Sequence, residues 1–218
     1  MTKNKAALDR AINEFWEIFW AEHSNLIDNE NHLNESLYFE ISDKLKEVHE
    51  DLCLEIAHNT SPRQLVISAD GIDDVFEFVE MVVSNRQNIS EKISGWEIIK
   101  YRQHRDDIEE QTITVGEHVF ELSQILFDLI IDEEVGIVVV MFIPDFDEAN
   151  DAHEMLRWVI LDNTIGEYDA VKKVGYFATY STAEMKDLDR NMTNEFKTLR
   201  HLKKDLDALW QEYIATTN

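Results

Sequence analysis

The sequence predicts an α+β fold: a mixed, mostly antiparallel sheet with two strand–helix–strand units, arranged as a ferredoxin-like or related sandwich with N- and C-terminal helices. Two stretches carry this prediction. Residues 136–180 contain an apolar run, an acidic turn, an amphipathic helical pattern and a second apolar run. Residues 64–102 repeat that order, with a β-branched run first and an alternating run last. Each stretch is typical of a strand, a crossover helix and a parallel strand, and such crossovers are almost always right-handed.

Two helices are expected before the first unit. The first is amphipathic with an unusually aromatic stripe, which we interpret as core packing rather than as a ligand or partner groove. The stripe consists of Leu8, Ile12, Phe15, Trp16 and Phe19. A polar loop over residues 25–32 leads to a second helix, expected over about residues 33–57. The buried edge of the second helix would consist of Leu37, Ile41, Leu45, Val48, Leu52 and Ile56.

The first unit is expected to begin with a strand over residues 64–69, which ends at the turn signal Asp70–Gly71. A helix should follow, and residues 95–102 alternate as a half-buried strand. Between the units, residues 112–122 are expected to form a short hairpin. Residues 124–131 fit a helix or a strand, and a strand is favoured because a tight turn and a strong strand follow.

In the second unit, the crossover helix is expected to begin at Asp147 and Glu148 and to end at Gly166. Ser181–Thr182 is the expected N-cap of a C-terminal helix. The basic side chains of that helix would lie against an acidic face of the same domain or of a second copy.

No low-complexity linker separates these parts, so a single α+β domain is expected over residues 1–218. It would comprise an N-terminal helical region (1–60), a sheet–helix core (64–180) and a C-terminal helical extension (182–216). At this length the chain can bury a proper core.

The charge is strongly unbalanced: 45 Asp and Glu against 20 Lys and Arg give a formal net charge of −25. A field of this sign repels phosphate backbones and anionic lipid headgroups, so neither nucleic acid nor a membrane is an expected partner. It attracts basic proteins or cations, although a solvated surface that prevents aggregation is the more common reason for such a charge. A basic protein partner is therefore expected.

The cysteine count and the N-terminus indicate the compartment. Cys53 is the only cysteine, so no intrachain disulfide can form. The N-terminus lacks the apolar block of a signal peptide, and the longest apolar run falls far short of the ~20 residues that span a bilayer. A cytoplasmic protein is expected.

Four features together resemble an uncharacterised bacterial family of acidic cytosolic α+β proteins with no established function. They are the aromatic N-terminal helix and residues 64–71 (QLVISADG), 95–103 (GWEIIKYRQ) and 161–169 (LDNTIGEYD). The resemblance covers most of the chain. It implies the fold class and the bacterial cytosol, and it supplies no catalytic residues.

An acidic cluster follows the strand at residues 136–143, where open sheets commonly bind ligands. Its candidate metal ligands are Asp145, Asp147, Asp151 and His153, because clustered carboxylates are ligands for hard cations. Acidic residues in the first turn of a helix are also favoured by the helix dipole alone, which we take as the more common explanation.

A second candidate is a polar pocket for a ligand or a partner. Glu167, Tyr168 and Asp169 follow a helix end and could meet Trp96 or Tyr101. The alternative is a structural corner, in which Gly166 takes the left-handed C-cap conformation that glycine adopts without steric cost.

No catalytic residues are predicted. His49 and Cys53 would share one helical face, but zinc generally needs four ligands, and a small buried apolar role suits Cys53 better. No nucleophile elbow, phosphate loop or dinucleotide fingerprint is present, so no cofactor is expected.

These observations favour a non-catalytic acidic protein that docks a basic partner. The most specific version of this hypothesis is an inhibitor or an immunity-type protein. The alternative is a metal-assisted hydrolase that uses the acidic cluster, with His153 or Glu154 as the acid–base. A homodimer through the first or the terminal helix is compatible with either function.

Overall fold

The computed structural model describes residues 5–28, 30–85, 95–116, 118–186 and 196–217. The chain divides into two compact units, residues 1–102 and residues 103–218, and each unit is described by itself. The expectation that they form a single domain stays a prediction. Within both units helices and sheets alternate, which confirms the α+β class.

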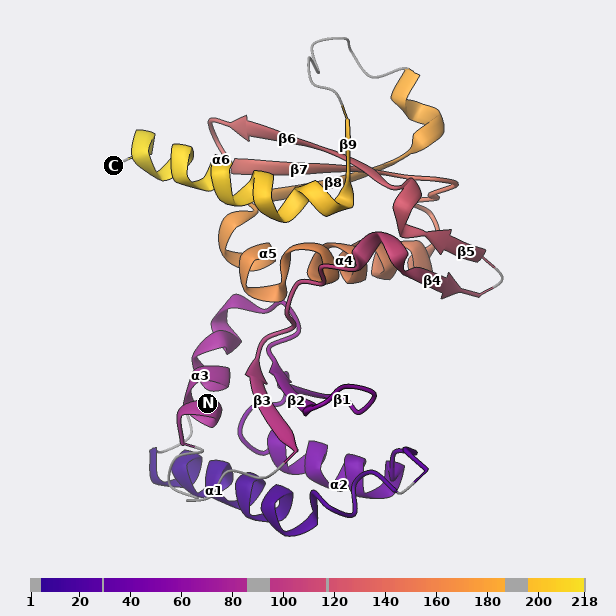
Figure 1. The fold of residues 1–218 in the computed structure, drawn as a ribbon. Coiled ribbons are helices and arrows are strands. Elements are labelled where there is room, and N and C mark those ends of the chain that lie inside the picture. Colours follow the sequence, from indigo (N-terminus) through magenta and orange to yellow (C-terminus); the bar gives the residue numbers. More distant parts are fainter. Residues whose placement is uncertain (1–4, 29, 86–94, 117, 187–195, 218) are drawn as a thin grey trace. The chain divides into compact units, whose positions relative to one another are not determined.

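Unit 1 contains three helices and a three-stranded sheet among its described residues (Figure 1). Its elements are α1 (Lys5–Glu22), α2 (Glu35–Lys46), β1 (Cys53–Ala57), β2 (Arg63–Ser68), the 3₁₀ turn η1 (Asp73–Val75), α3 (Phe76–Asn85) and β3 (Trp96–Lys100). β1 pairs antiparallel with β2, and β2 pairs parallel with β3. Because α3 connects two parallel neighbours, the first predicted strand–helix–strand unit is confirmed.

The helix predicted over residues 33–57 is wrong in its second half. α2 ends at Lys46, and Cys53 begins β1, whose register runs from Cys53 opposite Ser68 to Ala57 opposite Gln64. Leu52 and Ile56 are four residues apart, as on one face of a helix, but together with Leu54 they also alternate as in a strand, so the pattern alone did not distinguish the two structures. Pairing with β2 decides between them.

The aromatic stripe of α1 is buried in the core of unit 1, as predicted. Phe15, Trp16 and Phe19 are each 0% exposed. The indole Nε1 of Trp16 donates a hydrogen bond of 2.8 Å to the carbonyl oxygen of Val82 in α3. The stripe therefore packs inside its own unit, and a buried indole N–H finds the partner that it needs.

Unit 2 contains a two-stranded sheet and a four-stranded sheet among its described residues. Its elements are η3 (Ile108–Glu110), β4 (Thr112–Val115), β5 (His118–Glu121), η4 (Leu122–Gln124), β6 (Leu126–Asp132), β7 (Gly136–Ile143), α4 (Asp151–Ile165), α5 (Glu167–Lys173), β8 (Tyr176–Ser181), η5 (Thr182–Lys186), β9 (Lys197–Thr198), η6 (Leu199–His201) and α6 (Leu202–Thr217). The four-stranded sheet has the order β8-β7-β6-β9. β7 and β8 are parallel, and the other two pairs are antiparallel.

The prediction of one mixed sheet is wrong, because the described strands form three sheets. The hairpin β4–β5 and the strand β6 were predicted correctly, but β4 and β5 pair only with each other. The ferredoxin-like detail is not confirmed, since it requires a single sheet that contains both strand–helix–strand units. A pattern of apolar residues identifies strands, whereas their partners depend on turns and packing.

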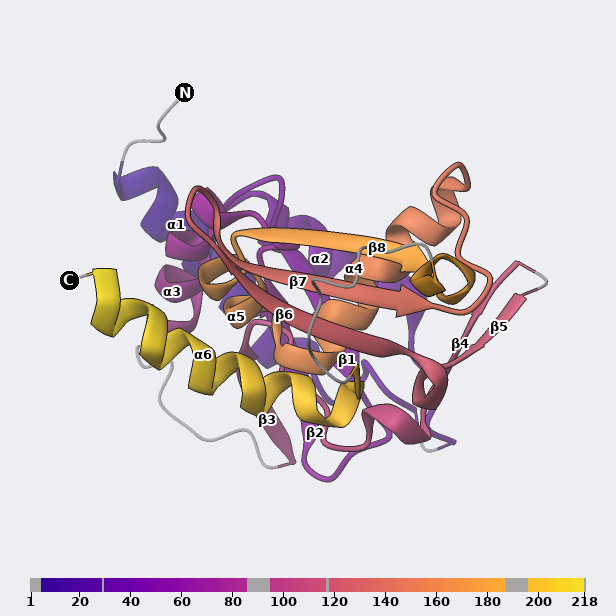
Figure 2. The ribbon, with the colours of Figure 1, turned by 90° about the horizontal axis from the view of Figure 1, so that it is seen from above.

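The core of unit 2 lies between the four-stranded sheet and its helices. Ile137, Val139, Met141 and Ile143 alternate along β7, and each is at most 1% exposed. They pack in one cluster with residues of α4, α5 and α6, such as Ile160, Ala170 and Leu206. Figures 1 and 2 show these three helices on the same face of the sheet. Alternate residues of a strand point to the same face, so these four side chains form the face of β7 that packs against the helices. Val140 and Phe142 on the other face are buried as well.

In unit 2 the crossover helix ends at Gly166 as predicted, but two helix starts and the conformation of Gly166 differ from the prediction. α4 begins after Asn150, whose side chain accepts a hydrogen bond from the backbone N–H of Ala152, and not at Asp147. Gly166 has φ 88° and ψ 144°, a conformation that is essentially limited to glycine but is not the left-handed cap, and α5 follows at once. The N-cap predicted at Ser181–Thr182 precedes only η5, and the terminal helix begins at Leu202.

Gly175 lies where the chain turns from α5 into β8. Its N–H donates a hydrogen bond of 2.8 Å to the carbonyl oxygen of Ile137. A Cβ atom at this position would overlap the backbone carbonyl of Val135. The two chain segments therefore approach each other as closely as a residue without a side chain allows.

Candidate functional site: a cleft between α1 and α2

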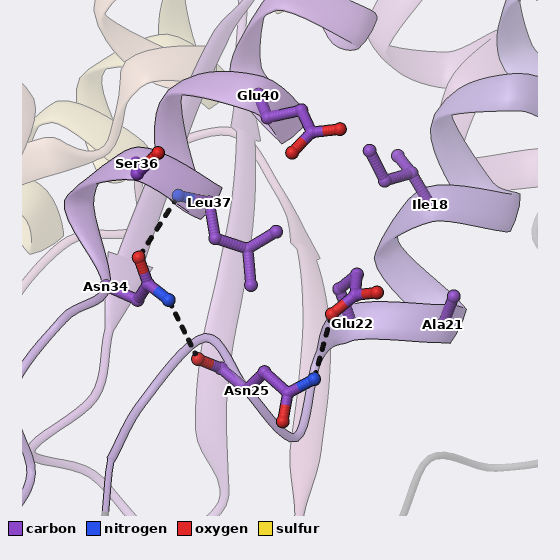
Figure 3. A pocket seen from close by; sticks show the side chains of 8 residues that line it. All are labelled: Ile18, Ala21, Glu22, Asn25, Asn34, Ser36, Leu37 and Glu40. Atoms are coloured by element: carbon purple, nitrogen blue, oxygen red, sulfur yellow. Dashed lines mark hydrogen bonds between the residues drawn. The ribbon is translucent and has the colours of Figure 1, made fainter.

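An open cleft of about 470 Å³ lies between α1 and α2 in unit 1 (Figure 3). Helix α1 contributes one wall, helix α2 the other, and the connection between them closes one end. The lining residues are Ile18, Ala21, Glu22, Asn25, Asn34, Ser36, Leu37 and Glu40. The volume falls in the range of about 300–1,000 Å³ that is usual for ligand sites.

The connection between the two helices has a defined structure. Leu26 and Ile27 are buried, and Ile27 forms an antiparallel bridge with Leu33. The Asp28 carboxylate accepts hydrogen bonds of 2.8 Å from the backbone N–H groups of Glu30 and His32. The hydrogen bond from the backbone of His32 is the largest influence that lowers the pKa of Asp28. This end of the cleft is therefore fixed by hydrogen bonds and by buried side chains.

A chain of side-chain hydrogen bonds crosses the closed end (Figure 3). Asn34 is the N-cap of α2, and its Oδ1 accepts a 3.2 Å bond from the N–H of Leu37. Its Nδ2 donates to the carbonyl oxygen of Asn25 at 3.5 Å. The Nδ2 of Asn25 in turn donates to Oε2 of Glu22 at 2.8 Å. Each amide group thus donates one hydrogen bond inside the protein, and the two carboxylates give the cleft a lining rich in acceptors.

Neither carboxylate of the cleft, that of Glu22 or that of Glu40, forms an ion pair among the residues that the structure describes. Lys44, one turn beyond Glu40, instead contacts Glu47 at 2.9 Å and Glu14 at 3.5 Å. The hydrogen bond from its ammonium group to Glu47 is the largest cause of the raised pKa of Lys44. The negative charge in the cleft is thus available to an external cation.

The cleft combines this charge with apolar surface. Leu37 is 9% exposed and Ile18 is half-buried, and Figure 3 shows both side chains pointing into the space between the helices. Carboxylates beside apolar side chains suit a cation that carries methylene groups. The methylene groups can contact the apolar side chains while the positive charge pairs with the carboxylates.

The sequence analysis did not select Glu22, Asn25, Asn34 or Glu40. The one local signal was Asn34, an N-cap residue directly before a helical pattern, which marks the start of α2. That Glu22 and Glu40 face one cleft depends on how α1 packs against α2, which the residue pattern does not specify.

Trp96 and Tyr101, both predicted as pocket residues, have structural contacts in unit 1. The Trp96 ring lies edge-on to Phe19 at 5.5 Å, with the Arg63 guanidinium 6.0 Å from its centroid. Tyr101 is 5% exposed, and its hydroxyl donates a 2.9 Å hydrogen bond to Glu80. These contacts hold β3 against α1 and α3.

Glu167, Tyr168 and Asp169 form the first turn of α5 in unit 2. Glu167 is completely buried and Tyr168 is 47% exposed. Asp169 accepts hydrogen bonds or ion pairs from Lys173 at 2.8 Å and Lys203 at 2.9 Å. These contacts fit the alternative of a structural corner. Since the other two predicted residues belong to unit 1, a pocket shared with them stays a prediction.

The acidic cluster after β7 is spread over a turn and the start of α4. Asp145 and Asp151 are exposed, and Asp147 caps the N–H of Ala149 at 3.0 Å. His153 is 2% exposed, and its Nδ1 accepts a 3.0 Å hydrogen bond from the backbone N–H of Asp147. Its ring lies among the rings of His118, Phe120 and Phe146. Within the described parts of the chain, no group of three or more His, Cys, Asp or Glu side chains could hold a metal ion. The metal-assisted alternative stays a prediction.

His49 and Cys53 do not share a helical face. Cys53 is the first residue of β1, and His49 lies in the preceding turn, where its ring packs against Phe78 at 4.5 Å. Burial is the largest cause of the raised pKa of the Cys53 thiol. A raised pKa reduces the thiolate fraction, which is the opposite of what activates a nucleophilic cysteine.

Comparison of the chain with protein-family models, with curated proteins and with solved structures found no match. The resemblance to a bacterial family of acidic proteins therefore stays a prediction. In the portion of the chain that the structure describes, no helix has both the length and the hydropathy needed to cross a membrane.

Proposed function

We propose that this protein is a non-catalytic binding or regulatory protein that docks a basic protein partner, in the manner of an inhibitor or an immunity protein. The observation that carries the proposal is the pair of carboxylates, Glu22 and Glu40, that line an open cleft without an ion-pair partner among the described residues. The net charge of −25 supports it, because a field of that sign attracts basic proteins over a distance of about a Debye length.

Some carboxylates of unit 1 contact cations of the same unit: Glu80 pairs with Lys100 at 2.8 Å and Asp70 with Arg102 at 2.7 Å. The two carboxylates of the cleft form no such pair among the described residues. A complementary positive side chain would add charge-assisted hydrogen bonds there, and complementary charge speeds the encounter and selects the partner.

The test is a pull-down from native lysate with the tagged full-length protein at low and at moderate salt. We expect a stoichiometric basic partner whose capture weakens as the salt concentration rises. The variant Glu22→Gln/Glu40→Gln should lose most of the capture. Its matched control is Glu133→Gln/Glu134→Gln, which removes the same two charges from the exposed turn between β6 and β7.

If the two double variants captured equal amounts of the partner, net charge alone would explain the attraction. The cleft would then no longer be part of the proposed binding surface. An empty pull-down at both salt concentrations, or turnover of a substrate by the purified protein that a cleft variant abolishes, would contradict the proposed function. Loss of a captured enzyme's activity on addition of this protein would support the inhibitory form.

A cytoplasmic location belongs to the same proposal, since the basic partner must share the compartment of this protein. Homodimerisation through a terminal helix also stays a prediction. Sedimentation equilibrium of the purified protein would check it independently of the partner.

A further inference from the structure

The structure points to a specific ligand chemistry for the α1–α2 cleft: we infer that it receives one arginine side chain of the protein partner. This inference rests on the proposed function and names the group that the partner would present. It uses the charge, the hydrogen-bond inventory and the apolar surface of the cleft.

The polarity of the lining selects a cation. Glu22 and Glu40 supply carboxylate oxygens, and none of the described residues that line the cleft is Lys, Arg or His. The side-chain amides of Asn25 and Asn34 each donate one hydrogen bond within the protein. An anion would therefore find no positive charge among these residues, whereas a cation would find acceptors with a formal charge of its opposite sign.

The positions of the acceptors favour a guanidinium over an ammonium group. Glu22 is at the end of α1 and Glu40 is in α2, so the carboxylates approach from opposite walls (Figure 3). Asn25 holds one of these carboxylates in place, because its Nδ2 donates a hydrogen bond to Oε2 of Glu22. A planar guanidinium has five N–H donors in a fixed arrangement, so it can form hydrogen bonds to acceptors on different sides. An ammonium group is a compact, more strongly hydrated charge.

A small apolar surface can contact part of the stem of the side chain. Leu37 forms the buried base, and Ile18 and Ala21 lie along the α1 wall. The three methylene groups of an arginine can cover this surface while the guanidinium stays between the carboxylates. Because the hydrogen bonds of Asn34 and Asn25 already fix the closed end, little ordering of the protein is required on binding.

The experiment is an NMR titration of the ¹⁵N-labelled full-length protein with Nα-acetyl-arginine amide. Nα-acetyl-lysine amide tests the choice of cation, and Nα-acetyl-citrulline amide is the uncharged analogue of nearly the same shape. We expect shifts concentrated on the backbone amides of the cleft, binding of the arginine compound about tenfold tighter than that of the lysine compound, and no binding of the citrulline compound. Glu40→Gln should weaken arginine binding by about the same factor, while Glu133→Gln/Glu134→Gln should bind as the wild type does.

Equal binding of the arginine and lysine compounds, shifts spread over the acidic surface, or arginine binding unaffected by Glu40→Gln would each overturn the inference. The Glu40 side chain forms no hydrogen bond or ion pair among the described residues, so its substitution should leave the fold intact and keep the test interpretable.

The pull-down separates this inference from the proposed function. A salt-sensitive partner that is lost in the cleft variant, together with no preference for arginine, would overturn the inference and leave the function standing. An empty pull-down with intact arginine binding would contradict the function and, with it, the assignment of the cleft to a protein partner.

Discussion

The contact between α5 and α6 in unit 2 and the cleft between α1 and α2 in unit 1 use their acidic residues in different ways. In unit 2, Asp169 of α5 and Asp207 of α6 surround Lys173 and Lys203, so that four side chains link two helices. In the cleft of unit 1, Glu22 and Glu40 lie on two neighbouring helices and form no ion pair among the described residues. The difference separates charge that stabilises the fold from charge that remains available for binding.

The same comparison can be made within unit 1. Arg102 pairs with Glu55 and Asp70, and Lys100 pairs with Glu80. Unit 1 therefore does place cations beside carboxylates where strands end. The two carboxylates of the cleft differ from these residues, because they form no ion pair among the described residues.

The largest effect is expected in the aromatic core of unit 1. Trp16→Ala should lower the free energy of unfolding by about 3–5 kcal/mol, because it removes a 0% exposed indole and leaves the carbonyl of Val82 without its donor. Its counterpart in unit 2 is Trp158, which is 49% exposed, and Trp158→Ala should cost about 1 kcal/mol or less. Urea unfolding followed by far-ultraviolet circular dichroism would measure both, and similar losses would contradict the burial described for Trp16.

The next effect concerns the ion pairs that join α5 and α6. Lys203→Met should cost about 1–3 kcal/mol, a value between those of exposed and buried pairs, because Asp169 has a side chain only 14% exposed. The control is Lys204→Met, at an exposed position next along α6, which should change the stability by less than about 0.5 kcal/mol. Equal effects of the two substitutions would show that the pairs contribute no more than general charge.

The N-cap of α2 should contribute about 1 kcal/mol. Asn34→Ala removes the acceptor for the N–H of Leu37, whereas Asn34→Asp keeps it. We expect Asn34→Ala to unfold at lower urea concentration and Asn34→Asp to retain most of the stability. If both variants lost the same amount, the bond from Asn34 to the carbonyl of Asn25 would be the more important contact.

A smaller, pH-dependent effect is expected at Asp207. Burial is the largest single influence on its pKa and raises it, but the hydrogen bonds and charges of Lys173 and Lys203 outweigh burial, so the pKa of Asp207 is lowered overall. A lowered folded-state pKa stabilises the protein above the unfolded-state pKa of about 3.9, and this stability is lost as the pH falls through the folded-state value. Unfolding of the wild type between pH 6 and pH 2.5 should therefore lose more stability than that of Asp207→Asn. Parallel profiles would contradict the pairing.

The smallest effect on stability is expected in the cleft. Glu40→Gln should change the free energy of unfolding by no more than about 0.5 kcal/mol, because no described partner is lost. Capture of the basic partner should nevertheless fall. A loss of stability as large as that of Lys203→Met would show that Glu40 contributes to the fold, and the contrast between the two units would disappear.

Much of the local structure could be predicted from the sequence. The buried run that became β7, the aromatic stripe of α1 and the Asp70–Gly71 turn each have one dominant pattern. The pairing of strands could not be predicted, since β4 and β5 could equally have extended a larger sheet. Residues 53–57 were ambiguous because their apolar positions fit two periodicities.

The candidate site was harder to predict than the fold. Sequence reasoning favoured clusters of neighbouring residues, such as the carboxylates around Asp147, which the structure spreads over a turn. The cleft instead combines Glu22 and Glu40, which are separated by a loop and come together only because α1 packs against α2. Side chains that meet through packing leave no spacing in the sequence from which to recognise them.

Gly175 has a consequence for how this protein can vary. A substituent at that Cα would have to occupy the place of the Val135 carbonyl, so even alanine would force apart the turn before β7 and the start of β8. We expect natural variants and saturation libraries to keep glycine there while the surrounding surface residues change freely. If Gly175 is retained in all functional variants, the reason would be the close approach of the two chain segments in the sheet. Such retention should not be interpreted as evidence of a role in binding.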